Sequence, residues 1–249
     1  MNYVFDIDGT LSFDGETIAP PILAAIRSLQ QCGHQVIFAS ARPIRDLLPM
    51  IPGFEDGLLI GANGALIADN RQIRPVAPIT PRDLQLVTEL IASERLSYIA
   101  DSCWNYAAQV DDTQPILNQL DPQQLAQKVA LPELNEVIKV ILVGLTMAQS
   151  TRLSAQLQAA TGLTIVQHTA EGNLDLTASK INKWSTLQRL GITRYVAFGN
   201  DENDRQLLQH ATTSVWVQSK PALNRLGQQL TDSQCSPTSV VEKIRALAD

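Results

Sequence analysis

The sequence predicts an α/β protein whose core is a doubly wound, mainly parallel sheet with a second, α+β domain inserted into it. Short apolar runs alternate with helical segments in the first and last thirds of the chain. Three prolines between residues 75 and 81 mark a linker, and the order of elements changes from there to about residue 172. We therefore assign residues 1–78 and 176–249 to the core domain and residues 79–175 to the insert.

The elements of the first core segment follow from apolar positions and helix breakers. A helix is expected over residues 20–33, because Ile22, Ile26 and Leu29 share one face and Gly33 ends the pattern. The other expected elements are an opening strand, buried strands at 35–39 and 58–60, a helix beginning at Pro43, and a hairpin of 65–68 with 72–76.

The insert and the second core segment differ in the order of their elements. In the insert we expect helices at 81–94 and 147–160, strands at 97–100, 104–110, 137–143, 164–167 and 173–176, and a Gln-rich stretch, 113–128, that is at least partly helical. Strict alternation then resumes, with helices at 181–190, 202–210, 221–226 and 240–247 and strands at 195–198 and 215–217.

Composition narrows the classes of partner. The 249 residues carry a net charge of -6 and no Lys/Arg run, which argues against nucleic acid. The longest apolar run, residues 137–147, is far shorter than the roughly 18 residues of a membrane span. Three scattered cysteines favour a reducing compartment, and no leader is expected before a strand that begins near residue 2. We predict a cytoplasmic protein with no evident obligate protein partner.

The opening strand ends in two carboxylates, in the stretch Asp6-Ile7-Asp8-Gly9-Thr10. Side chains alternate along a strand, so Asp6 and Asp8 would share a face if the strand continued. Burying two carboxylates is costly unless a cation lies between them, and Gly9 lets the backbone close around a ligand. The alternative is a strand-to-turn junction whose aspartates only cap a loop.

Other polar clusters follow neighbouring strands. In open α/β sheets ligands bind at the carboxyl ends of the strands. We therefore expect the opening turn to lie close to residues 40–42, 63–64 and 199–204. Asn200, Asp201 and Asp204 supply hard oxygen ligands that suit magnesium. Ser40 would donate to a phosphate oxygen, or would simply cap the next helix.

A lysine is also expected, because a fixed ammonium stabilises the charge on a transferring phosphoryl group. Lys180 and Lys183 both begin the helix that follows the insert. A cation there opposes the helix dipole unless an anion is bound beside it.

Taken in order, these motifs resemble those of the haloacid dehalogenase superfamily of phosphatases, in the Cof-type branch that includes sugar-phosphate phosphatases. The opening turn matches the first motif, Ser40 the second, Leu174-Asp175-Leu176 with Lys183 the third, and residues 199–204 the fourth. The resemblance covers both domains and implies a Rossmann-like core with a cap inserted between the second and third motifs. Two positions depart from the family pattern: Trp184 replaces a glycine, and Asn200 replaces the first aspartate of the fourth motif.

The resemblance implies a division of roles. Asp6 would attack phosphorus, and Asp8 would protonate the leaving alcohol and then activate water. The cofactor is expected to be Mg²⁺. Its ligands would come from Asp6, Asp8, Asn200, Asp201 and Asp204, and the phosphate would be held by Gly9, Thr10, Ser40, Lys183 and Asn203.

The insert would close over the site and select the leaving group. The candidates for substrate contact are Arg42, Asn63, Trp104 and Asn173, with Asn105, Lys139 and His168 also considered. Each has an alternative to substrate contact. Trp104 could pack in the core or on a sheet face, and Lys139 could lie on a solvated strand face. His168 could be an ordinary surface residue, and Arg42 could pair with an aspartate.

The sequence therefore predicts a magnesium-dependent phosphatase that acts on a small phosphorylated metabolite, with a sugar phosphate implied by the resemblance. Two alternatives stay open. A phosphomutase would share Asp6 and Asp8 but return the phosphoryl group to its substrate. A non-catalytic module would sense a phosphorylated ligand, with Asn200 as the sign of lost turnover.

Overall fold

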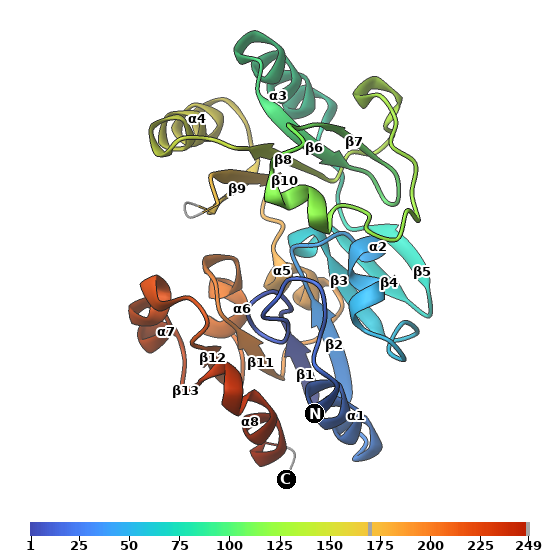
Figure 1. Ribbon diagram of the computed structural model, residues 1–249, viewed down its shortest axis with the longest axis vertical. Helices are drawn as coiled ribbons and strands as arrows, with labels where there is room; N and C mark the ends of the chain where they lie inside the picture. The colour runs from blue at the N-terminus through green and yellow to red at the C-terminus, as the bar shows by residue number, and fades with distance from the viewer. Residues whose placement is uncertain (169–170, 248–249) are drawn as a thin grey trace.

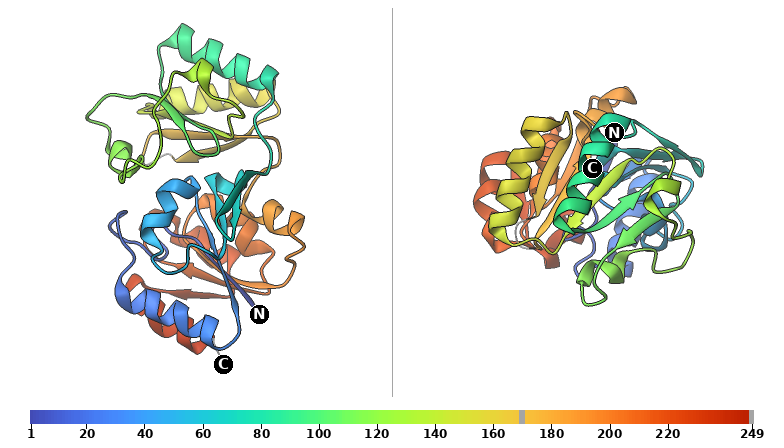
Figure 2. Two further views of the ribbon diagram at one scale, coloured as in Figure 1. Left: turned by 90° about the vertical axis from the view of Figure 1, so that its right-hand side faces the viewer. Right: turned by 90° about the horizontal axis from the view of Figure 1, so that it is seen from above.

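The computed structural model describes residues 1–168 and 171–247 and consists of two lobes, each built on its own sheet (Figures 1 and 2). In the larger lobe, the described strands run in the order β13-β12-β11-β1-β2-β3-β4-β5. The six from β13 to β3 are parallel, and β4 and β5 add an antiparallel hairpin. These strands are β1 (Asn2–Phe5), β2 (Gln35–Ala39), β3 (Leu58–Gly61), β4 (Leu66–Asp69), β5 (Gln72–Pro75), β11 (Tyr195–Gly199), β12 (Thr213–Val217) and β13 (Ser233–Cys235). The predicted mainly parallel α/β architecture is confirmed.

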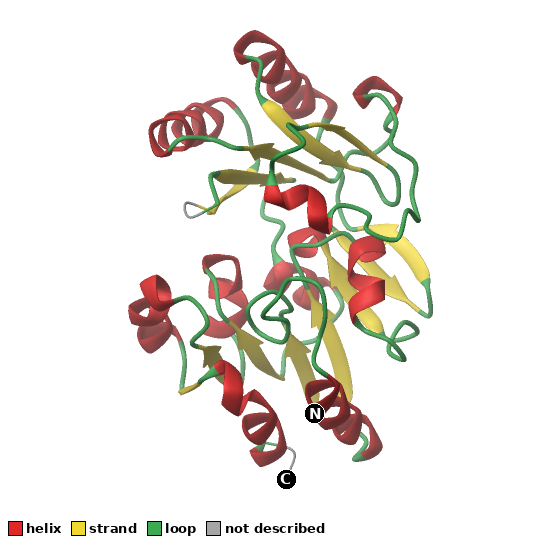
Figure 3. Cartoon of the chain, in the orientation of Figure 1, coloured by secondary structure: helices red, strands yellow, loops and turns green. Residues whose placement is uncertain are grey.

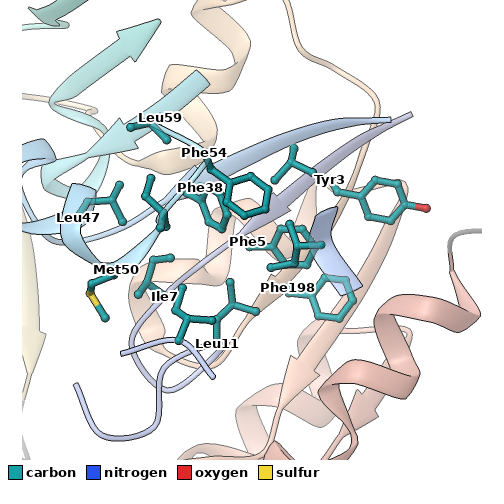
Figure 4. Packing of buried hydrophobic residues seen from close by; sticks show 14 of the residues in the cluster. Tyr3, Phe5, Ile7, Leu11, Phe38, Leu47, Met50, Phe54, Leu59 and Phe198 are labelled. Atoms are coloured by element: carbon teal, nitrogen blue, oxygen red, sulfur yellow. The ribbon is translucent and has the colours of Figure 1, made fainter. Parts of the chain in front are cut away.

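Helices cover both faces of this sheet, as the three-layer arrangement of Figure 3 shows. The helices of the core are α1 (Pro20–Gln31), α2 (Ile44–Leu47), α5 (Lys183–Arg189), α6 (Arg205–Gln209), α7 (Asn224–Leu230) and α8 (Val240–Ala246). Alternation along β1 explains the layers. Tyr3 and Phe5 pack with α1 and α8, whereas Val4 packs with α5, α6 and α7. Phe5 meets Phe198 of β11 at the centre of this core, with ring centroids 4.9 Å apart (Figure 4).

The second lobe is an antiparallel sheet, ordered β7-β6-β8-β10-β9 among the described residues. Its strands are β6 (Ser97–Asp101), β7 (Tyr106–Gln109), β8 (Lys139–Val143), β9 (Thr164–His168) and β10 (Asn173–Thr177), and its helices are α3 (Pro81–Glu94) and α4 (Met147–Ala160). Both helices lie on the face turned away from the core (Figure 2). Val140 and Leu142 pack among them, while Lys139 and Ile141 alternate to the opposite face, which lines the cavity between the lobes.

Three stretches of the chain differ from the sequence expectations. The segment 113–128 forms only a 3-10 turn, Pro115–Gln119, because Asp121 (φ 46°) and Gln124 (φ 54°) adopt the left-handed region, which interrupts a helix. Strand β10 continues to Thr177 in the second sheet, so the chain leaves the insert two residues after the predicted boundary at 175/176. Strand β13, which the apolar pattern did not indicate, adds a polar edge strand to the core.

No helix in the described parts of the chain is both long enough and apolar enough to span a bilayer.

Candidate active site

The predicted site residues gather where the carboxyl ends of β1, β2, β3 and β11 face the second sheet. A cavity of about 200 Å³ lies there, lined by both lobes. Asp6, Asp8, Arg42, Asp201 and Asn203 line it from the core. The residues that line it from the insert include Ile99, Asp101, Ile116, Leu120, Lys139, Ile141, His168, Glu171, Asn173 and Asp175. The insert therefore closes the open end of the core sheet.

Asp6 directly follows β1 and is 4% exposed. One carboxylate oxygen, Oδ1, accepts a hydrogen bond from Lys183 Nζ at 2.6 Å, and Oδ2 accepts one from Thr10 Oγ1 at 2.9 Å. Burial and the nearby charge of Asp204 raise the pKa of Asp6, and the Lys183 ammonium opposes that shift. Asp6 is thus a costly buried carboxylate held in place by one cation.

Lys183, the first residue of α5, lies between two carboxylates. Its Nζ is 2.6 Å from Asp6 Oδ1 and 2.7 Å from Asp204 Oδ1. Burial alone would lower the pKa of Lys183, but the charges of Asp204 and Asp6 raise it well above the usual range. Asn182 caps α5 by accepting from the Ser185 N–H at 2.8 Å. This cap fixes the start of the helix and with it the position of Lys183. Lys180 is exposed, so the geometry favours Lys183 as the site lysine.

Gly9, Thr10 and Asn200 pack together beside Asp6. Gly9 has a φ of +78°, and a Cβ atom there would lie 2.1 Å from Asn200 Nδ2. The Thr10 hydroxyl is 2.9 Å from Asp6 Oδ2 and 3.0 Å from Asn200 Oδ1. A hydroxyl has one hydrogen to donate. One of these two buried oxygens is therefore always short of a full hydrogen bond.

This donor set fits a magnesium ion. Asp6 Oδ2 and Asn200 Oδ1 converge on one hydroxyl, and both are hard oxygens of the kind magnesium prefers. The Asp8 main-chain carbonyl is close by in sequence. Within residues 1–168 and 171–247, no group of three His, Cys, Asp or Glu side chains is placed to hold a metal. A metal here would depend on amide and main-chain oxygens as well as on Asp6.

The other two predicted metal ligands are engaged elsewhere. Asp204 Oδ2 accepts from the main-chain N–H groups of Asn200 at 3.0 Å and Asp201 at 3.2 Å, and its Oδ1 accepts from Lys183. Asp201 pairs with Lys220 and accepts from the Glu202 N–H at 2.6 Å. Burial would raise the pKa of Asp201, but the hydrogen bond from Lys220 lowers it. These contacts give Asp204 a positioning role beneath the site and place Asp201 on the cavity wall.

Asp8 faces the cavity and is held by Arg42. Arg42 Nε donates to Asp8 Oδ2 at 2.9 Å, and Nη2 donates to Asp8 Oδ1 at 2.6 Å. The same Nη2 also donates to the Gly15 carbonyl at 2.6 Å. Of the two interpretations of Arg42, the structure thus shows pairing with an aspartate. A bidentate pair fixes the plane of the Asp8 carboxylate as well as its position.

Ser40 lies at the end of β2 and is fully buried. Its Oγ accepts from the Arg42 main-chain N–H at 3.0 Å. The hydroxyl therefore shapes the turn that carries Arg42.

Asn63 and Asn203 connect the core to the insert. Asn203 Nδ2 donates to Asn63 Oδ1 at 3.0 Å, and Asn63 Nδ2 donates to Asp175 Oδ2 at 2.9 Å. Asn203 Oδ1 is buried without a partner among the described residues. Lys139 Nζ reaches the same Asp175 oxygen at 2.7 Å and donates to the Ala41 carbonyl at 2.9 Å. Asp175, which the sequence placed only in a strand, is the centre of this network.

Three insert candidates prove different from their predicted settings. Lys139 is 3% exposed rather than solvated, and His168 lines the cavity, with Nε2 3.4 Å from Asp175. Burial would lower the pKa of His168, but Asp175 raises it. Trp104 is not brought to this cavity. Its indole N–H donates to the Leu125 carbonyl at 2.8 Å, and its side chain lines a separate cavity beside α2.

Asn173 does line the main cavity, where its Oδ1 accepts from the Gly144 N–H at 3.4 Å. Sequence reasoning missed Asp46, Asp101 and Lys220 on the cavity wall. Asp101 had a signal, because a lone carboxylate directly follows the predicted strand 97–100. No sequence signal indicated Lys220, because its role depends on a contact with Asp201 that forms only in the folded chain.

Comparisons with known proteins agree with this geometry. A family model described as haloacid dehalogenase-like hydrolase matches residues 3–243. None of the curated proteins matches the chain. Similar solved structures include haloacid dehalogenase-like hydrolases from B. subtilis (TM-score 0.81, 19% identity, 99% of both chains) and from Bacteroides thetaiotaomicron (0.80, 18%, 99% of this chain and 98% of that chain). A subclass IIB sugar phosphatase of the same superfamily is similar over 99% of this chain and 98% of its own (0.77, 19%).

Proposed function

Because the chain belongs to the haloacid dehalogenase-like hydrolases, as its sequence motifs predicted, we propose that it is a magnesium-dependent phosphatase that hydrolyses a small phosphorylated metabolite, a sugar phosphate, in the cytoplasm. The observation that carries the proposal is the pair Asp6 and Asp8 in the cavity between the lobes, each held by a different cation. The likeness to a sugar phosphatase supports the substrate class. The three cysteines, all free thiols, support a reducing compartment.

In the proposed reaction Asp6 supplies the nucleophile. Its carboxylate oxygen bonds to phosphorus as the phosphorus–oxygen bond to the leaving alcohol breaks, which gives an aspartyl phosphate. Asp8 gives its proton to the departing alkoxide oxygen and then takes one from the water that attacks the aspartyl phosphate. That second step releases inorganic phosphate and restores Asp6.

The other residues of the site hold the phosphoryl group in line with Asp6. Lys183 places a fixed positive charge beside the reacting carboxylate, and the Ser40 hydroxyl, at the end of the neighbouring strand β2, would donate to a phosphoryl oxygen. Magnesium, bound by Asp6, the Asp8 carbonyl and Asn200, would neutralise charge on the phosphoryl oxygens. Arg42 orients Asp8 toward the cavity, and the insert keeps bulk water away during attack.

A substrate panel tests this function directly. The purified protein is assayed for phosphate release with sugar phosphates and an aryl phosphate, with magnesium and with a chelator, beside the isosteric variant Asp6→Asn. We expect turnover only with the metal and none from Asp6→Asn, whose melting temperature should stay near that of the unaltered protein. Release of phosphate by Asp6→Asn at an undiminished rate would refute the assigned nucleophile.

The same panel separates the two alternatives. A phosphomutase would form an isomeric sugar phosphate without net phosphate release. A sensing module would show a rise in melting temperature with a phosphorylated ligand and no turnover with any substrate.

A further inference from the structure

The end of the cavity formed by α2, β6 and the segment 114–127 has an excess of negative charge. Arg45, buried at 1% exposure, is the cation there, and Asp46, Asp101 and Asp121 surround it. Arg45 Nη2 is 2.6 Å from Asp101 Oδ1, and Arg45 Nε is 3.1 Å from Asp46 Oδ1. One guanidinium thus faces three carboxylates in a buried setting.

The carboxylate oxygens of this cluster are not used equally. Both oxygens of Asp121 accept main-chain N–H groups, from Leu125 at 2.7 Å and Ala126 at 3.0 Å. Both oxygens of Asp46 accept from Arg45, and Oδ1 accepts also from the Asp121 N–H at 3.0 Å. Asp101 uses only Oδ1, and its Oδ2 has no hydrogen-bond partner among the described residues.

The residue that carries this open acceptor lines the cavity. Asp101 is 1% exposed and lines the same cavity as Asp6 and Asp8. Alternation along β6 puts Ile99 on the same face, and Ile99 and Ile141 pack together there. Apolar neighbours exclude water, so an unpaired carboxylate oxygen at this place favours a ligand that donates a hydrogen bond to it.

The arginine and the two lysines that line the cavity do not offset this charge, because each already has a carboxylate partner. Arg42 pairs with Asp8, Lys139 pairs with Asp175 at 2.7 Å, and Lys220 pairs with Asp201. A second anionic group on the substrate would find no unpaired cation among these residues. It would instead approach the excess carboxylates around Arg45.

We propose that Asp101 determines specificity by accepting a hydrogen bond, through Oδ2, from a hydroxyl or ammonium group at the far end of the leaving group. The substrate class is then phosphomonoesters of polyols or amino polyols, and compounds with a second phosphate or a carboxylate at that end are rejected. This inference rests on the proposed phosphatase function. Arg45 is a positioning residue, because it holds Asp101 Oδ1 and leaves Oδ2 unpaired among the described residues.

Matched substrates test the proposal. The kcat/KM is measured for a hexose 6-phosphate, the corresponding 2-amino sugar 6-phosphate and 6-phosphogluconate, each divided by the value for an aryl phosphate with the same enzyme. We expect the hydroxyl and amino substrates to exceed the carboxylate by about tenfold or more. The amino and hydroxyl substrates identify which donor is preferred.

Two variants assign this preference to Asp101. Asp101→Asn keeps the acceptor for Arg45 and replaces Oδ2 by a donor, so the ratio of hexose 6-phosphate to 6-phosphogluconate should fall about tenfold. Asp121→Asn removes the same charge from the same cluster, but Asp121 does not line the cavity, so the ratio should hold. An unaltered ratio in Asp101→Asn, or an equal fall in both variants, overturns the proposal.

Failure of the function and failure of the inference are distinguishable. If the aryl phosphate is hydrolysed but 6-phosphogluconate is used as well as hexose 6-phosphate, only the inference about Asp101 fails. If nothing is hydrolysed, the same three ligands are ranked by calorimetric binding to the unaltered protein and to Asp101→Asn. The inference is supported if the unaltered protein binds the hydroxyl and amino ligands more tightly than 6-phosphogluconate and Asp101→Asn loses this preference. Equal affinities of the unaltered protein for the three ligands overturn it.

Discussion

Replacing Lys183 by Met should be the most informative single change in the core. The methylene chain of Met fills most of the buried space, but Asp6 and Asp204 lose the ammonium that lies 2.6 Å and 2.7 Å from them. Breaking a buried ion pair in this way costs about 3–5 kcal/mol. For a chain of this size that corresponds to a fall in melting temperature of roughly 6–20 °C.

The loss should depend on pH in a defined direction. Without the ammonium, the pKa of Asp6 rises further, because burial and the nearby charge of Asp204 are then unopposed. An acid whose folded pKa is raised loses stability as pH rises through that pKa. The deficit of Lys183→Met should therefore be small near pH 5 and should grow toward pH 8.

A double variant provides the control. In Lys183→Met/Asp204→Asn, the asparagine oxygen still accepts from the N–H groups of Asn200 and Asp201, and one of the two unpaired charges disappears. Urea unfolding at pH 8 should show at least half of the lost stability recovered, although neither variant should release phosphate. Equal stability of the single variant and the unaltered protein, or no recovery in the double variant, would refute this account of Lys183.

Three further changes test other parts of the structure. Gly9→Ala places a methyl group 2.1 Å from Asn200 Nδ2 at a φ of +78°, so turnover should fall more than tenfold and the melting temperature should drop, as a magnesium titration and a thermal scan would show. Burial raises the pKa of Asp46 to about 7 despite Arg45, so the protein should lose stability between pH 4 and 7, by at most about 4 kcal/mol for three pKa units. Asp46→Asn should flatten that part of the curve, and an unchanged slope would contradict the assignment. Arg42→Lys cannot form the bidentate pair with Asp8, so kcat should fall about tenfold with little change in KM, and a rise in KM alone would point to a contact with substrate instead.

The positions of Asp6 and Lys183 in the candidate site were predictable from the sequence, because one directly follows a strand and the other begins a helix. Asp6 follows an apolar run, and Lys183 follows a capping asparagine, so local pattern and sheet topology together place them. The buried parallel strands were equally predictable, because such strands are near-continuous apolar runs.

The cavity walls were less predictable, because their residues act through contacts between the two lobes. Lys139 in an apolar strand suggested a solvated face, but its partner Asp175 lies on the neighbouring strand and buries it. The segment 113–128 had helical composition, yet Asp121 caps two main-chain N–H groups, which stabilises a loop in place of a helix. Neither pairing can be found from spacing in one sequence.

Strand β10 also limits how this protein could be recombined. All five of its residues are buried in the second sheet, and Lys183 begins α5 only six residues after the strand ends at Thr177. A cassette exchange at the predicted boundary would sever the strand and separate Asp175 from its partners Lys139 and Asn63. A viable graft must keep β10 with the incoming lobe and rejoin the host between Thr177 and Asn182. Laboratory recombination of specificity between members of this family would therefore carry Asp175 with the donor lobe and retain the recipient's lysine.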